Sequence, residues 1–296
     1  MLNGIINVYK EKGYTSHDVV AKLRGILGQK KIGHTGTLDP EAEGVLPICL
    51  GKGTKLCDMI ENTDKTYQVT MLLGTETDTE DMTGTILKQS PVSCTEAEVT
   101  EAILSFQGEI MQVPPMYSAL KVNGKKLYEL ARQGKEIHRE PRPITIHEIQ
   151  ILSMNLPEVV MTVRCSKGTY IRSLCRDIGA KLSCGGCMKA LIRTEACGFK
   201  HATSYRLDEI EHIKKNGDVN MIMISIDHMF LHYPAVVIPS SMNKLLYNGN
   251  PIRVETKISG EKVRVYDDKE HFIGIYSHQK GRLKPIKLFF DMETFH

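Results

Sequence analysis

The residue whose setting most favours chemistry is Asp39, in the glycine-rich segment GHTGTLDP at residues 33–40. The proline that follows restricts the backbone of Asp39 to extended angles. A carboxylate held on such a rigid loop can act as a nucleophile or as a general base. An Asp-Pro pair is also a frequent turn, so the residue types alone leave a catalytic carboxylate and a simple turn both open.

Two segments of the sequence can be compared with known kinds of ligand-binding loop. A phosphate-binding loop needs a second glycine five residues after the first, and the position five residues after Gly44 is Cys49. The acidic stretch at residues 76–81 lacks the glycine and the closing glutamate of a calcium loop. We therefore predict that this stretch is a solvated turn.

The sequence contains eight cysteines, of which Cys184 and Cys187 form a C-x-x-C pair. A structural zinc site usually needs a second such pair or two histidines at matching spacing, and none stands out. Cys165, Cys175 and Cys197 lie nearby in the sequence, which leaves a metal open. Reduced, partly buried thiols are the simpler expectation for a cytosolic chain.

Alternating strands and helices are predicted to position these residues. Residues 4–9 read as a buried strand, and Ser16 is predicted to cap a helix that runs to Leu27. Tyr67 is expected on one face of a strand at 66–73, together with Val69 and Met71. Further elements are a helix opened by the capping box at residues 95–98, strands at 144–152 and 158–165, and a helix at 173–182.

The segment 115–143 differs from its surroundings, because it is flanked by prolines and has few large apolar residues after Lys121. It carries seven basic residues against three glutamates: Lys121, Lys125, Lys126, Arg132, Lys135, Arg139 and Arg142. On charge alone it is either a solvated surface segment or an arm that contacts phosphates.

The pattern changes again after residue 232. Short β-type runs at 235–238, 252–255, 262–266 and 272–276 are separated by turns, with hairpin signals at Asn248-Gly249 and Asp267-Asp268. We predict a catalytic domain at residues 1–232 and a small β-rich domain at 233–296.

The composition sets broad limits on location and partners. The net charge is +3, which by itself does not indicate a nucleic-acid-binding protein. No apolar run reaches the ~18–20 residues that span a bilayer, and the N-terminal segment does not read as a signal peptide. We expect a cytoplasmic protein with no membrane association.

Several blocks of the sequence closely resemble the TruB family of tRNA pseudouridine synthases. The main block is GHTGTLDPEAEGVLPICLGKGTK at residues 33–55. The others are residues 4–20, DKTY at 64–67, TDTED at 77–81, QVPPMYSA at 112–119, CSKGTYIR at 165–172 and LIRT at 191–194. They stand in the order and spacing of the family over residues 1 to about 200. Residues 233–296 are similar to a PUA domain.

The resemblance implies a role for each matching residue. Asp39 corresponds to the nucleophile, Arg172 to the arginine that pairs with it, and Tyr67 to the tyrosine that stacks on the target base and is implicated in proton removal. Four further residues would bind the substrate. They are His34, which enters the vacated base stack, Lys55 near the active site, and the pocket residues Tyr170 and Leu191.

The resemblance also implies a fold and a reaction. The fold would be α+β, with a large mixed, mostly antiparallel sheet flanked by helices and a small C-terminal PUA-like domain. The reaction would convert uridine 55 in the T loop of tRNA to pseudouridine by base flipping. The insertion at 115–143 would close over the RNA. No cofactor, metal or obligate protein partner is implied, and a monomer is expected.

Two other functions remain open on the sequence alone. One is a non-catalytic RNA-binding protein that keeps the scaffold, although a pure binder does not need Asp39, Tyr67 and Arg172 together. The other is a carboxylate-dependent nucleosidase or glycosylase, which would cleave at C1′ of a flipped nucleotide and release the base. The product formed from tRNA distinguishes all three.

Overall fold

The computed structural model describes residues 1–60, 63–122, 124–254 and 259–290. Within these residues, the body of the protein is a ten-stranded sheet. Its main path runs in the order β14 (Met223–Ile224), β1 (Gly4–Lys10), β3 (Glu43–Leu50), β12 (Gly186–Ala196), β4 (Lys65–Leu73), β11 (Glu158–Cys165), β10 (Arg142–Asn155) and β7 (Gly108–Gln112). Two short strands lie off this path: β2 (Ile32–His34) pairs with β3, and β13 (Phe199–Lys200) pairs with β12.

The strands at the centre of the sheet have mixed direction. Strands β3 and β12 pair parallel over Glu43–Gly44 and Ile192–Arg193, whereas every other strand pair of this sheet within the described residues is antiparallel. The predicted α+β class with a mixed, mostly antiparallel sheet is therefore confirmed.

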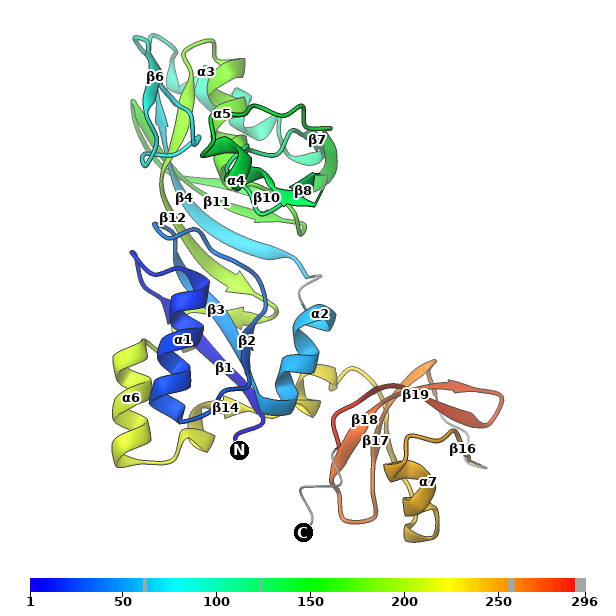
Figure 1. Ribbon diagram of the computed structural model, residues 1–296. Helices are drawn as coiled ribbons and strands as arrows, with labels where there is room; N and C mark the ends of the chain where they lie inside the picture. The colour runs from blue at the N-terminus through cyan, green and yellow to red at the C-terminus, as the bar shows by residue number, and fades with distance from the viewer. Residues whose placement is uncertain (61–62, 123, 255–258, 291–296) are drawn as a thin grey trace.

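Helices cover the two halves of the sheet separately (Figure 1). One apolar cluster joins α1 (Ser16–Leu27) and α6 (Leu207–Asn216) to β1, β2 and β3. A second cluster joins α3 (Glu96–Leu104) and α5 (Ile171–Lys181) to β4, β10, β11 and β12. The loop between β2 and β3, which carries Asp39, thus lies where the two halves meet.

Both predicted N-terminal helix signals have structural counterparts, with one correction. Thr95 caps α3 and forms the expected capping box with Glu98. Helix α1 is capped by Thr15 in a box with Asp18, so the prediction that Ser16 is the cap was wrong by one residue. Helix α5 begins at Ile171, two residues before the predicted start, because Tyr170 is its N-cap residue. This places Arg172 in the first turn of a helix.

The insertion leaves the sheet between two paired strands, β7 and β10. It contains the short hairpin of β8 (Lys121–Val122) and β9 (Lys125–Lys126), followed by α4 (Leu127–Ala131). Leu127 and Leu130 are buried, which fixes α4, while most of the basic side chains are exposed. The predicted excursion from the core is therefore present, with a small packed base.

The C-terminal part forms its own five-stranded sheet, in the order β15 (Ala235–Val237), β17 (Lys262–Tyr266), β18 (Phe272–Gln279), β19 (Arg282–Leu288) and β16 (Ile252–Arg253). The last residue of the predicted run 252–255 lies outside the described residues, and β19 was not predicted. Asn248 and Gly249 end helix α7 (Asn243–Tyr247) instead of forming a hairpin. Ile275 and Phe289 pack with Ile5 and Leu56, which joins this sheet to the body near α2 (Cys57–Ile60).

Candidate active site

The loop that carries Asp39 is held from the side of α1 and β1. The main-chain nitrogen of Leu38 donates a hydrogen bond to Ser16 Oγ at 2.9 Å. Leu38 is itself 4% exposed and packs in the cluster of β4 and α5. Ser16, which the sequence suggested as a helix cap, therefore fixes the residue before Asp39.

Lys10 holds the other side of the same loop. Its side chain is fully buried, and Nζ donates to the carbonyl oxygen of Pro40 at 3.0 Å and to that of Ala42 at 2.5 Å. Burial lowers the pKa of Lys10 to about 8, against the opposing effect of Glu43 and Asp39. A buried ammonium group is expensive unless its hydrogen bonds are made, so this lysine ties the loop tightly to β1.

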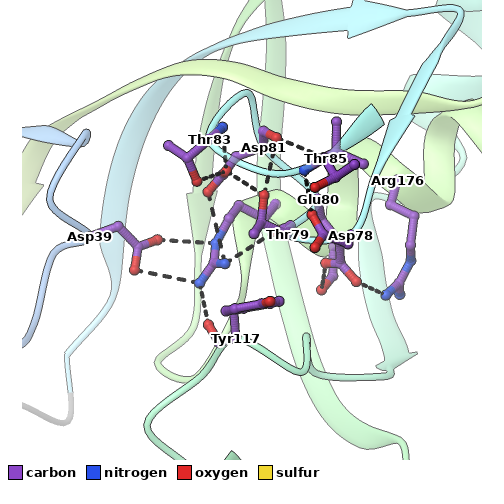
Figure 2. Close-up of polar contacts among 12 residues, drawn as sticks. Asp39, Asp78, Thr79, Glu80, Asp81, Thr83, Thr85, Tyr117 and Arg176 are labelled. Carbon is purple, nitrogen blue, oxygen red and sulfur yellow. Dashed lines mark hydrogen bonds and ion pairs between the residues drawn. The ribbon is translucent and has the colours of Figure 1, made fainter. Parts of the chain in front are cut away.

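Arg172 meets Asp39 from the opposite direction. Its Nε lies 3.0 Å from Oδ2 of Asp39, and its Nη2 donates to Oδ1 at 3.4 Å (Figure 2). The predicted pair is thus present, in the two-point geometry that favours an ionised carboxylate. The Arg172 side chain is 7% exposed and that of Asp39 is 40% exposed. The arginine is therefore a buried support, and the carboxylate is the member that a substrate can reach.

The remaining donors of Arg172 are also occupied. Nη1 donates to the carbonyl oxygen of Thr79 at 3.1 Å and lies 3.9 Å from Oδ2 of Asp81. Nη2 donates to the carbonyl oxygen of Tyr117, in the insertion, at 2.8 Å. A guanidinium group held at this many points has little freedom to rotate. Its orientation fixes the Asp39 carboxylate in turn.

The turn between β5 (Thr75–Thr77) and β6 (Ile86–Gln89) is part of this site. Thr79, Glu80 and Asp81 are each 9% exposed or less, so the prediction of a solvated turn was wrong. Asp81 Oδ1 accepts hydrogen bonds from Thr79 Oγ1 at 2.7 Å and from the main-chain nitrogen of Thr83 at 2.9 Å. These bonds replace those that the polar groups of the buried turn would otherwise make with water.

Asp81 is a site residue that the residue-by-residue interpretation missed. The signal that could have found it was the alternation of threonine and acidic residues at 77–81, since hydroxyl and carboxylate side chains at this spacing bond to one another and to the backbone. The pattern could not show that Asp81 also faces Arg172, because that residue lies on a helix far away in the sequence.

The surroundings of Asp39 act on its ionisation in opposite directions. Burial raises the pKa of Asp39 above its ordinary value, Arg172 lowers it, Asp81 raises it and Lys10 lowers it. The net direction is upward, because removal from water outweighs the two cations. Loss of Arg172 would therefore raise the pKa of Asp39 further.

Tyr67 and Leu191 lie in one apolar cluster with Leu38, next to Asp39. Both side chains are 8% exposed. Burial raises the pKa of Tyr67 to about 12, although the charge of Arg193, its neighbour across β4 and β12, lowers it. The phenol is consequently neutral near pH 7. The expected strand face, shared with Val69 and Met71, is present.

Arg193 is a second buried arginine in the site, and the sequence marked it only as a member of the LIRT block. It is 1% exposed, and its Nε and Nη2 donate to the carbonyl oxygens of Val45 at 2.7 Å and Gly36 at 3.2 Å. It therefore joins β12 to β3 and to the start of the Asp39 loop.

Tyr170 stands at the start of α5, two residues before Arg172. Its main-chain nitrogen donates to Gln112 Oε1 at 2.8 Å, and Gln112 Nε2 donates back to its carbonyl oxygen at 3.0 Å. Burial raises the pKa of Tyr170, while Ser118 and Arg172 lower it. The start of α5 is thereby fixed to the root of the insertion, close to Arg172.

His34 ends β2, on the side of the loop that faces α1. Its ring lies edge-on to that of His17, with 5.4 Å between ring centres, and its Nδ1 accepts from the main-chain nitrogen of Gly36 at 3.3 Å. Burial lowers the pKa of His34, and the charges of His17 and Arg193 lower it further. The ring is therefore neutral near pH 7, which suits stacking.

Within the described residues, Lys55 makes no hydrogen bond or ion pair with the groups around Asp39. Its Nζ donates to the carbonyl oxygen of Leu288 at 2.8 Å, in β19 of the C-terminal sheet. It lies in the 3-10 segment Gly51–Leu56, which leads away from β3 toward that sheet. The structure thus gives it a role in joining the two sheets.

The described residues contain no group of three or more histidine, cysteine or acidic side chains that could hold a metal ion. Cys184 and Cys187 are free, buried thiols. No described helix is long and apolar enough to cross a membrane. The contacts around Asp39 offer one reachable carboxylate that is paired with the buried Arg172.

Comparison with solved structures defines the class of fold. The chain is similar to a chain in the crystal structure of a Cbf5-Nop10-Gar1 complex, with a TM-score of 0.72 and 26% identity over 98% of this chain and 86% of that one. A chain in the structure of an H/ACA RNP bound to a substrate RNA containing 2′-deoxyuridine has the same fold, with a TM-score of 0.70.

Sequence comparison then gives the family. Residues 24–171 match the N-terminal domain of the TruB family of pseudouridylate synthases, residues 172–230 match the C-terminal domain of tRNA pseudouridylate synthase B, and residues 234–289 match a C-terminal segment of pseudouridine synthase II TruB. The chain is 53% identical to tRNA pseudouridine synthase B of Lachnoclostridium phytofermentans, over 97% of this chain and all of that one. It is 47% identical to that of Clostridium acetobutylicum, over 97% and 99%. The chain belongs to the TruB family, and it is a tRNA-modifying pseudouridine synthase.

Proposed function

We propose that this enzyme converts uridine 55 in the T loop of tRNA to pseudouridine, with Asp39 as the nucleophile. The observation that carries the proposal is the two-point contact between Asp39 and Arg172, in which the guanidinium group is buried and the carboxylate is 40% exposed. A carboxylate that is oriented, paired with a guanidinium group and reachable meets the requirements of nucleophilic catalysis.

The reaction is an isomerisation and needs no second substrate. The bond between N1 of uracil and C1′ of the ribose breaks, the base turns, and C5 forms the new bond to C1′. The proton on C5 is released, and N1 gains one. Asp39 is proposed to act on the flipped nucleotide so that N1 leaves C1′, and the carboxylate is free again once C5 has bonded to C1′.

The flipped uracil is proposed to lie beside the apolar cluster next to Asp39. Taking a base out of its stack costs a few kcal/mol, part of which an aromatic face can restore. Tyr67 would stack on the base, with Tyr170 and Leu191 lining the pocket. With a pKa of about 12, Tyr67 is almost wholly protonated near pH 7, so it would remove a proton through a small phenolate fraction, which the nearby charge of Arg193 favours.

The remaining parts of the chain are proposed to bind the T stem-loop. His34, neutral and aromatic, would occupy the vacated base stack. The basic residues of the insertion would contact phosphates and close over the RNA. Residues 233–296 would form a PUA-like RNA-binding domain beside the catalytic domain at 1–232. The proposal includes a cytoplasmic monomer that needs no cofactor, metal or protein partner.

Nucleoside analysis of treated tRNA tests the proposal. An unmodified tRNA transcript should gain one pseudouridine, at position 55, and a transcript with cytidine there should gain none. An abasic site would indicate a nucleosidase, and unchanged RNA a binding protein. Pseudouridine formed at another position would refute the site assignment but not the reaction.

A further inference from the structure

A second arginine–carboxylate pair lies one helical turn along α5 from Arg172. Arg176 Nη1 forms an ion pair with Glu80 Oε1, and Glu80 Oε2 accepts a hydrogen bond from Ser173 Oγ at 2.6 Å. The Glu80 side chain is 9% exposed and that of Arg176 is 30% exposed. Ser173 and Arg176 both follow Arg172 on α5, so Glu80 is anchored to the helix at two points just beyond Arg172.

Glu80 sits between the two residues of the turn that contact Arg172. Thr79 supplies a carbonyl oxygen and Asp81 a carboxylate oxygen to the same guanidinium nitrogen, Nη1 (Figure 2). Any rotation of the turn about Glu80 would therefore displace both acceptors together. The conformation of this one residue thus governs one side of the Arg172 environment.

The backbone of Glu80 adopts a conformation that needs external support. Its φ is +64°, in the left-handed region that residues other than glycine seldom occupy. Such a conformation is strained and persists only where its surroundings fix it. Here the carbonyl oxygen of Glu80 accepts from the main-chain nitrogen of Met188 in β12 at 3.0 Å, and its side chain is held by α5.

Arg176 also reaches the root of the insertion. Its Nη2 donates to the carbonyl oxygen of Val113 at 3.3 Å, four residues before Tyr117, whose carbonyl oxygen accepts from Arg172. Two arginines on consecutive turns of α5 therefore hold the same two segments, the turn at 78–85 and the start of the insertion. Helices are rigid over one turn, so the two sets of contacts move together.

We propose that Glu80 and Arg176 are positioning residues for the catalytic pair, because they fix the turn and the insertion root that orient Arg172 against Asp39. The inference rests on the proposed role of Asp39 and extends it to two residues that do not contact Asp39. A misplacement of about 1 Å at a reacting group can cost ~100-fold in rate.

Glu80→Gln is the variant that tests the pair, because glutamine can still accept the hydrogen bond from Ser173 but cannot form the ion pair. Asp177→Asn is the matched control. Asp177 contacts Arg176 at 2.7 Å, and within the described part of the chain it makes no hydrogen bond or ion pair with the turn. Both variants take one charged partner from the same arginine. Arg176→Lys keeps the positive charge but lacks the planar guanidinium group with its several donors. It serves as a second test if Glu80→Gln folds poorly.

The measurements are the single-turnover rate of pseudouridine formation, the Kd for tRNA and the pH dependence of the rate, all taken well below the Tm of each variant. Glu80→Gln should lower the rate ~10–100-fold with the Kd within about 2-fold of the parent. It should also move the acidic limb of the profile to higher pH. The charged groups that face Asp39 are Arg172 of α5, Asp81 of the turn and Lys10 of β1. The variant should loosen Arg172 and Asp81, so that Arg172 lowers the pKa of Asp39 less than in the parent.

The outcomes separate this inference from the proposed function. If Glu80→Gln lowers the Tm but keeps the parent rate and acidic limb, as expected of Asp177→Asn, the pair is structural only and the inference is wrong. If Asp39→Asn, assayed in parallel, turns over normally, the proposed function itself fails. If Asp39→Asn is inactive and Glu80→Gln is slow with a shifted limb, both stand.

Discussion

The guanidinium group of Arg172 meets the carboxylate of Asp39 at two points, although 133 residues separate them in the sequence. Arg172 comes from the first turn of α5, on one half of the sheet, and Asp39 from the loop between β2 and β3, on the other. The candidate site therefore lies between two separately packed halves of the sheet. Its geometry depends on the contacts that hold the segment on each side.

Asp39→Asn should abolish turnover while tRNA still binds. The amide keeps the size of the side chain but has no negative charge with which to attack, and loss of a nucleophile typically costs more than ~10³-fold in rate. Release of tritium from tRNA labelled at uracil C5 measures turnover, and a filter-binding titration measures affinity. Normal tritium release would sink the assignment of Asp39.

Arg172→Lys should shift the acidic limb of the pH–rate profile upward. Arg172 lowers the pKa of Asp39, against burial, which raises it. A lysine cannot reproduce the two-point contact, so less of Asp39 will be ionised at a given acidic pH. The rate should fall further at pH 6 than at pH 8 relative to the parent. A uniform loss at both values would mean that Arg172 does not control this ionisation.

Lys10 should contribute more to stability as the pH rises. Its pKa is about 8 in the folded protein and near 10.5 when exposed, so between these values the unfolded chain holds more protons. The contribution of this group to the free energy of unfolding should therefore increase with pH across that interval. Urea titrations of the parent and Lys10→Met at pH 7 and pH 10 measure the difference between them. A difference that stays constant would mean that the folded protein leaves the pKa of Lys10 at its ordinary value.

Neutralising the insertion should weaken tRNA binding in a salt-dependent way. Lys121→Gln with Lys125→Gln is expected to lower affinity and to reduce the salt slope by about one for each phosphate that is no longer neutralised. Lys214→Gln with Lys215→Gln, on the exposed face of α6, removes the same charge elsewhere. If the two double variants show equal salt slopes for tRNA binding, the insertion is an ordinary solvated segment and does not contact phosphates.

Gly44→Ala should destabilise the protein by ~2–4 kcal/mol. At this position φ is +107°, and an added Cβ would lie 2.2 Å from the carbonyl oxygen of Arg193, on the parallel strand β12. Gly25→Ala is the control, because this helical glycine has open space around it and alanine should stabilise α1 by up to ~1 kcal/mol. Urea unfolding of both variants compares them directly. A Gly44→Ala protein as stable as the parent would show that the two strands can separate at this point.

The elements themselves were largely predictable from the sequence, because local rules govern them. The strand of Tyr67 and the capping box at Thr95 follow from side-chain period and capping chemistry. The apolar stripe of α5 predicted that helix as well, although its start was placed two residues late. The predictions were wrong where one local sequence pattern is compatible with two different structures. Asn248-Gly249 suits a hairpin turn or a helix end, and the acidic turn at 76–81 reads as solvated unless its buried arginine is known.

The family and the reaction were accessible from the sequence because the motif blocks are specific, and they placed Asp39, Arg172, Tyr67 and Leu191 correctly in one region. Lys55 shows the limit of that reasoning, since a residue inside a matching block points to another sheet. Block membership fixes position along the chain but not the direction of a side chain.

The sequence by itself indicated which groups could react: Asp39 beside a proline, and Arg172 and Tyr67 within blocks that match the family. Only the tertiary structure decided how they are held. Four residues hold the site through bonds to backbone atoms or charges that lie far away in the chain: Lys10, Asp81, Glu80 and Arg176. A hydrogen bond to a carbonyl oxygen leaves no mark in the sequence, because every residue carries that oxygen.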